Sequence, residues 1–188
     1  MARTESTMLP LGTPAPEFRL LDVTSGNLIT LETFQGKKAL LVMFICRHCP
    51  YVKHVQRQLA AIGHDYAAQS VGIVAISSND ADAYPDDAPE SLRAMAAELG
   101  FRFPFCYDET QEAAKAFHAV CTPEFYVFDA ERTLAYRGQL DNSRRHTTIP
   151  ITGADVRSAI DAILNDRPVK AEQIPSLGCS IKWREGAG

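Results

Sequence analysis

The chain has 188 residues, and its 19 Lys and Arg against 23 Asp and Glu give a formal net charge of −4. A mildly acidic chain has no electrostatic attraction to nucleic acid or to an anionic membrane, so we expect neither as a partner. Hydrophobic residues make up 46% and charged residues 22%, a balance typical of one globular domain. No apolar run reaches the roughly 20 residues of a membrane span. The start of the chain lacks the apolar core of a secretory signal, so we expect a cytoplasmic protein.

The first half of the chain predicts an irregular arm, a hairpin and a buried central strand. Residues 1–16 are rich in Pro and Gly and read as the arm. Phe18–Val23 and Leu28–Leu31 flank a Thr-Ser-Gly-Asn turn, which favours a hairpin. Leu40–Ile45 is continuously apolar, as in a strand buried on both faces.

A helix and a second buried strand follow. Apolar residues recur at helical spacing after residue 50, at Val52, Val55, Leu59 and Ile62. Val71–Ile76 is again continuously apolar. Strand, helix and strand in this order predict a right-handed crossover and a parallel pair. A helix is expected to begin with Pro89, after a polar loop at 77–88.

The second half predicts further elements of the same α/β domain. Asp108 and Gln111 resemble a capping box that opens a helix, and Phe125–Phe128 begins a hairpin. Thr152 is expected to cap a last helix, and residues 169–188 form a tail without clear periodicity. We therefore predict a single domain over residues 1–188, in which helices flank a central mixed sheet.

Five cysteines are the most informative residues: Cys46, Cys49, Cys106, Cys121 and Cys179. An odd number in a chain without a signal argues against a disulfide framework. Two of them form the motif Cys46-Arg47-His48-Cys49 between the central strand and its helix. In a reducing compartment such a pair is more often redox-active or metal-binding than structural.

The position of this motif favours thiol chemistry. Unpaired N–H groups and the positive end of the dipole at a helix start stabilise a thiolate. Arg47 and His48 add positive charge and are predicted to lower the pKa of the attacking thiol. A second cysteine one turn away can close a disulfide and release a bound substrate. We assign Cys46 as the attacker, exposed at the strand end, and Cys49 as the less accessible resolver.

A second candidate element is Cys121-Thr122-Pro123, just before the strand that begins near Phe125. If this strand lies antiparallel to Leu40–Ile45, Pro123 faces the two motif cysteines. A cis Pro there would leave the backbone of Thr122 free to pair with an extended substrate. Cys121 and Cys179 are possible third thiols of the site.

These motifs resemble the thioredoxin fold, in its peroxiredoxin-like (alkyl hydroperoxide reductase/thiol-specific antioxidant) branch. The resemblance rests on an entry segment, the Cys motif with its following Pro50-Tyr51-Val52-Lys53-His54, the Thr122-Pro123 loop and the tail around Gly178–Trp183. It covers roughly residues 10–183. It implies a thioredoxin core, thiol–disulfide or peroxide-reducing activity, and a cis Pro beside the cysteines.

Two departures shape the functional prediction. Pro50 follows Cys49 instead of lying between the cysteines, which favours a helix starting near Cys49. The assignment of Cys46 as attacker follows the resemblance to thioredoxins, and the position of Pro50 leaves the order of the two thiols open. The peroxiredoxin pattern is broken, because Val42 stands in place of its Pro and Cys46 in place of its Thr.

The main hypothesis is a thiol–disulfide oxidoreductase without a cofactor or metal, whose partners are a protein or small-molecule disulfide and a thiol reductant. The alternatives are a peroxidase that uses Cys49 as peroxidatic cysteine, and a thiol-based metal-binding module. The oligomeric state is left open.

Overall fold

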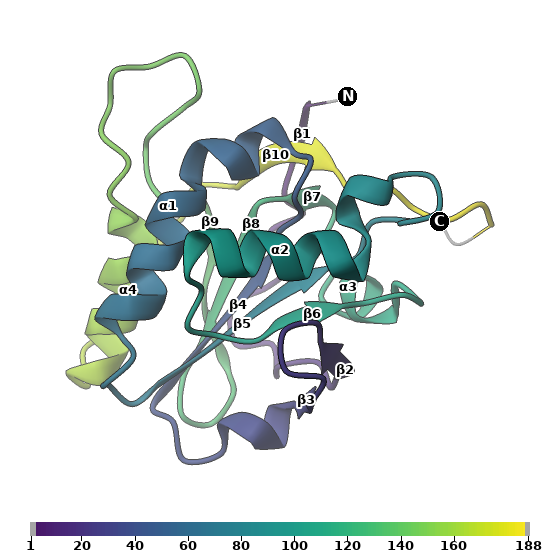
Figure 1. The fold of residues 1–188 in the computed structure, drawn as a ribbon. Helices are drawn as coiled ribbons and strands as arrows, with labels where there is room; N and C mark the ends of the chain where they lie inside the picture. Colours follow the sequence, from purple (N-terminus) through teal and green to yellow (C-terminus); the bar gives the residue numbers. More distant parts are fainter. Residues whose placement is uncertain (1–2, 187–188) are drawn as a thin grey trace.

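A seven-stranded mixed sheet runs through the middle of the protein, in the order β3-β2-β6-β5-β4-β8-β9 (Figure 1). The computed structural model describes residues 3–186. The strands of this sheet are β2 Arg19–Asp22, β3 Leu28–Thr30, β4 Ala39–Phe44, β5 Val71–Ser77, β6 Phe105–Tyr107, β8 Glu124–Phe128 and β9 Leu134–Gly138. The helices are η1 Leu31–Phe34, α1 Pro50–Asp65, η2 Pro85–Asp87, α2 Pro89–Leu99, α3 Glu112–Ala116 and α4 Ala154–Leu164.

Strand β4 is the centre of the sheet, as its apolar sequence predicts. It pairs with β5 in parallel and with β8 antiparallel, and all six of its residues are buried. Alternate side chains point to opposite faces. Leu41 and Met43 enter one hydrophobic core and Leu40, Val42 and Phe44 the other.

The helices cover both faces of the sheet. Apolar residues of α1, α2 and α4 fill the core on one face, where these helices lie together in the front of Figure 1. On the other face α3 and η1 pack with Phe44, Phe117, Tyr126 and Phe128. No helix within residues 3–186 is long and apolar enough to cross a membrane.

A second, three-stranded sheet corrects two predictions about the chain ends. The arm at 1–16 contains strand β1 Arg3–Glu5, and the tail at 169–188 contains strand β10 Leu177–Ser180. Strand β10 pairs antiparallel with β1 on one side and with β7 Cys121–Thr122 on the other. Periodicity could not reveal strands this short, because three or four residues are too few to establish a pattern.

The helix starts predicted from Pro residues are confirmed, whereas the starts predicted from polar capping residues differ from the structure. Pro50 and Pro89 are the first residues of α1 and α2. The last helix has Gly153 as its N-cap instead of Thr152, and the N–H groups of Asp155 and Val156 in its first turn donate to the Leu140 carbonyl oxygen. Helix α3 is only five residues long. Asp108 accepts hydrogen bonds from the N–H groups of Ala113 and Ala114 in its first turn, but the predicted capping box is not completed, because Gln111 donates to Ser78 and Lys182 instead.

Candidate active site

The Cys46–Cys49 loop connects the end of β4 to the start of α1, with Cys49 as the N-cap residue of the helix. Both thiols are free, and both residues have 0% of their surface exposed. The prediction that Cys46 faces solvent is therefore wrong. Strand β4 is covered on both faces, so a residue just after its end is still enclosed by the core.

Both sulfur atoms contact Thr122. Cys46 Sγ lies 3.3 Å from the Thr122 hydroxyl, and Cys49 Sγ lies 3.2 Å from the Thr122 carbonyl oxygen. The Thr122-Pro123 peptide bond is cis, as predicted. The loop that precedes β8 thus closes over the dithiol from the side opposite α1.

The pKa values of the two thiols are displaced in opposite directions. A hydrogen bond from Cys46 lowers the pKa of Cys49 to about 4, against the cost of burial and with support from the Val52 N–H and the Thr122 side chain. Burial raises the pKa of Cys46 well above its usual value, and the hydrogen bond to Cys49 and the charge of Asp87 add to this. Helix N-terminal amides favour a thiolate, so Cys49 holds the negative charge and Cys46 the proton.

A buried carboxylate, Asp87 at the end of η2, holds the motif in place. Its Oδ1 accepts hydrogen bonds from the backbone N–H groups of Arg47 and His48 at 2.7 and 3.1 Å. Its Oδ2 binds Nδ1 of the His48 ring and accepts a bond from Asn79 at 2.8 Å. Burial opposes ionisation of Asp87, but these hydrogen bonds outweigh it and lower its pKa.

Arg47 binds partners away from the sulfur atoms, whereas a ring nitrogen of His48 lies within 4.8 Å of Cys46 Sγ. Arg47 donates to the Ser91 carbonyl at 2.5 Å and pairs with Glu98 at 3.1 Å. The His48 ring stacks on Tyr84 with a centroid distance of 5.3 Å. Tuning of a thiol by these two side chains stays a prediction.

The other three cysteines lie at different distances from the Cys46–Cys49 pair. Cys179 on β10 is opposite Thr122 in the strand register, lies in the same buried cluster as Cys49, and helps to lower the pKa of Cys49. Cys121 is buried and donates to Glu124 at 3.6 Å, and burial and this carboxylate raise its pKa. Cys106 lies on β6, in the core of the opposite face.

The predicted docking of a substrate on the backbone of Thr122 stays a prediction. That backbone is already paired, because Cys179 of β10 is its partner. Strand β10 also packs on α1, and Figure 1 shows it next to the start of this helix. The chain's own strand therefore occupies the edge that was expected to receive substrate.

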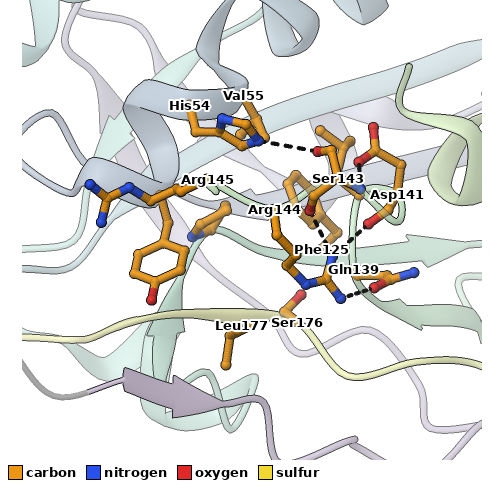
Figure 2. Close-up of a pocket in the computed structure, with 13 residues that line it drawn as sticks. His54, Val55, Phe125, Gln139, Asp141, Ser143, Arg144, Arg145, Ser176 and Leu177 are labelled. Atoms are coloured by element: carbon orange, nitrogen blue, oxygen red, sulfur yellow. Dashed lines mark hydrogen bonds between the residues drawn. The ribbon is translucent and has the colours of Figure 1, made fainter. Parts of the chain in front are cut away.

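Figure 2 shows a recess beside this region, lined in part by His54, Phe125, Arg144 and Leu177. Pro123 also contributes to its wall. The Arg144 guanidinium is held there by Gln139 and by the carbonyl oxygens of Asp141 and Ser143. With a volume of about 40 Å³ the recess has room for only a few water molecules.

One set of side chains has the geometry of a metal site. A sulfur of Cys46, a ring nitrogen of His48 and an oxygen of Asp87 lie within 4.8 Å of one another. Thiolate, imidazole and carboxylate are ligands that zinc accepts. Asp87, however, already accepts four hydrogen bonds, so a metal ion would have to displace some of them.

Comparison with known families places this site in context. Residues 11–137 match the AhpC/TSA family. The chain belongs to the AhpC/TSA family. No curated protein matched.

Two solved structures resemble this AhpC/TSA protein over nearly its whole length. An uncharacterized conserved protein from Geobacillus kaustophilus is 53% identical, with a TM-score of 0.96 over 98% of this chain and 97% of that one. A hypothetical protein from Sinorhizobium meliloti 1021 is 45% identical, with a TM-score of 0.95 over 97% and 100% of the two chains. A thiol:disulfide interchange protein of the thioredoxin family from Chlorobium tepidum is 19% identical, with a TM-score of 0.63 over 81% and 97%. This last similarity shows the thioredoxin-like fold.

Sequence reasoning missed Asp87 and Asn79, which organise the Cys loop. Both lie in the polar segment 77–88, whose acidic and amide residues read as an ordinary solvated loop. Nothing local distinguishes the buried Asp87 from its exposed neighbour Asp86. The parallel pairing of β4 and β5 could have indicated these residues. Neighbouring parallel strands end at the same edge of a sheet, so the segment after β5 lies close to the Cys loop after β4.

Proposed function

We propose that this protein is a thiol–disulfide oxidoreductase in which Cys49 attacks the substrate disulfide and Cys46 resolves the intermediate. The observation that carries this proposal is the opposite displacement of the two pKa values at the start of α1. The thiolate is the nucleophile in disulfide exchange, so the cysteine with the lowered pKa is the attacker. This order reverses the one expected from the sequence.

The reaction would have two steps, both of them exchanges. The Cys49 thiolate attacks one sulfur of the substrate disulfide, a Cys49–substrate disulfide forms, and the other substrate half leaves as a thiolate. The Cys46 thiol then loses its proton and attacks Cys49 Sγ, so that a Cys46–Cys49 disulfide forms and the second substrate half leaves. Two electrons pass to the substrate, and a thiol reductant would restore the dithiol.

The enclosure of the site favours a particular class of substrate. Both thiols lack exposed surface, and β10 occupies the backbone edge of Thr122. A small disulfide needs only a local opening to reach Cys49, whereas an extended polypeptide would have to displace β10. We therefore favour a small-molecule disulfide, or one exposed at the tip of a protein loop.

The test compares single-cysteine variants with a limiting amount of dithiodipyridine, whose two halves leave as coloured pyridinethione. The reduced wild type should release both halves, and Cys49→Ser should release them far more slowly. Cys106→Ser is the matched control, because Cys106 lies in the opposite core, and it should behave as wild type. Reaction of Cys49→Ser at the wild-type rate would contradict the proposal.

A peroxidase is the second candidate, and the lowered pKa of Cys49 also favours it. Here the thiolate takes an oxygen from a hydroperoxide, leaving an alcohol or water and a sulfenic acid on Cys49. Cys46 then condenses with it, forming the disulfide and releasing water. Rapid loss of one hydroperoxide per reduced chain, together with no reaction of dithiodipyridine at Cys49, would favour this candidate over disulfide exchange.

A further inference from the structure

Cys179 is held beside the reactive cysteine by a strand that fits closely. In β10 it lies between Gly178 and Ser180 and is opposite Thr122 of β7. A side chain at Gly178 would be impossible without movement, because its Cβ would lie 2.0 Å from the Thr122 carbonyl oxygen. Only a glycine allows β10 to approach this closely, and that approach brings the next residue to the dithiol.

The Cys179 and Cys49 side chains lie in the same buried cluster as Cys46, close enough for each to shift the pKa of the other. Cys49 therefore has two thiol neighbours, Cys46 from its own loop and Cys179 from the tail strand. Each of them interacts with the Cys49 sulfur in the folded protein. The arrangement offers two routes by which an intermediate on Cys49 can be resolved.

The charges around the two neighbours differ. Burial raises the pKa of Cys179 to about 12, and the hydrogen bond to Cys49 and the charge of Cys49 add to this, while Lys182 opposes it. Once Cys49 is bonded to a substrate, its negative charge is gone. Cys179 then keeps the favourable Lys182, whereas Cys46 keeps the unfavourable Asp87. The charges that remain in the intermediate therefore favour ionisation of Cys179 over that of Cys46.

We propose that Cys179 is a second resolving thiol of this site, which attacks the Cys49–substrate disulfide and forms a Cys49–Cys179 bond. This inference rests on the proposed function. The thiolate of Cys179 bonds to Cys49 Sγ, the bond between Cys49 and the substrate half breaks, and that half leaves as a thiol with the proton that Cys179 gave up. The substrate disulfide is reduced and the pair Cys49 and Cys179 is oxidised, so no further oxidant is required. The product links β10 covalently to the start of α1.

Cys121 supplies a matched control for this role. It is as buried as the other site thiols and lies in the strand next to β10. Its partner is the carboxylate of Glu124, at 3.6 Å, and that negative group disfavours a thiolate. Cys121 should therefore take no part in resolving Cys49, although it lies in the same small sheet.

The experiment uses the reduced full chain with limiting dithiodipyridine, and it counts released pyridinethione and maps disulfides by mass. Cys46→Ser should release two halves per reagent molecule and contain a Cys49–Cys179 disulfide. Cys46→Ser/Cys179→Ser should release one half and retain the other on Cys49. Cys46→Ser/Cys121→Ser should behave as Cys46→Ser, and Cys179→Ala replaces Cys179→Ser if the serine prevents folding.

The outcomes separate this inference from the proposed function. If Cys46→Ser retains the adduct on Cys49 as the Cys179 double variant does, Cys179 does not resolve and the inference fails while Cys49 remains the attacker. If the Cys179 double variant still releases two halves, another thiol resolves and the inference also fails. If no variant forms a bond at Cys49, the proposed function itself is overturned.

Discussion

The pH dependence of Cys49 reactivity is the most direct measure of the site's chemistry. With a pKa of about 4, the thiol is protonated in only about one molecule in a thousand at pH 7. With the ordinary value of 9.0 it would be ionised in about one molecule in a hundred. Alkylation of Cys49 should therefore be nearly constant between pH 6 and 8, whereas an ordinary thiol would react about 100-fold faster at the upper end.

A pair of substitutions at Cys46 tests the cause. The hydrogen bond from Cys46 is the largest contribution to the lowered pKa, and a hydrogen bond to a charged group contributes about 1.5–3 kcal/mol. Cys46→Ala removes the donor and should raise the pKa of Cys49 by about 1 to 2. Cys46→Ser keeps a donor of similar size and should leave it close to the wild-type value.

The assay is alkylation with iodoacetamide at a series of pH values, with Cys49 quantified by peptide mass mapping. Burial of Cys49 lowers the absolute rate in every variant, so the shape of each profile is compared instead. A wild-type rate that climbs about 100-fold between pH 6 and 8 would refute the assignment of the thiolate to Cys49. Identical profiles for the Ala and Ser variants would refute the role of Cys46 as donor.

Three further changes test the surroundings of the dithiol. Gly178→Ala would force β10 away from the Thr122 carbonyl, so it should speed alkylation of Cys49 and lower the free energy of unfolding by about 1–3 kcal/mol. An alkylation rate equal to wild type would contradict the covering role of β10. Asp87→Asn should cost about 1–3 kcal/mol in urea unfolding, whereas the exposed neighbour in Asp86→Asn should cost less than about 0.5 kcal/mol. Because the pKa of Asp87 in the folded protein lies below 3.8, its contribution to the free energy of unfolding is complete above that pH and is lost as the pH falls through the lowered value. Acid unfolding curves should show this loss of stability in the wild type and not in Asp87→Asn. His48→Ala should raise the pH midpoint of Cys49 alkylation if the ring contributes to the thiolate's stability, and an unchanged midpoint would leave His48 with the structural role of binding Asp87.

The central part of the fold was predictable because its signals are local. Continuous apolar runs predict β4 and β5, and Pro50 and Pro89 mark the first residues of their helices. The Cys motif lies at a junction of strand and helix, and this local position is enough to indicate thiol chemistry without knowledge of the tertiary structure. These features depend on neighbours in the sequence, which pattern reasoning can use.

The missed features depend on contacts between distant segments. The order of the thiols could not be read from the motif, because Asp87 and Thr122, from two other loops, set the charges around it. The position of Cys179 depends on the pairing of β10 with β7, which are more than fifty residues apart. Thr152 shows a different failure, since the Leu140 carbonyl oxygen, from a segment before the helix, accepts the first-turn N–H groups of α4 that Thr152 was expected to bind.

The pairing of β1 with β10 has a practical consequence for anyone who modifies the ends of this chain. Strand β1 begins at Arg3, and its residues Arg3 and Thr4 are opposite Cys179 and Gly178. Removal of the first six residues would leave one side of β10 as an open edge, and such edges recruit strands from other molecules. A tag placed directly before Arg3 would adjoin β1, so enzymatic assays and oligomer measurements should use protein from which such a tag has been cleaved.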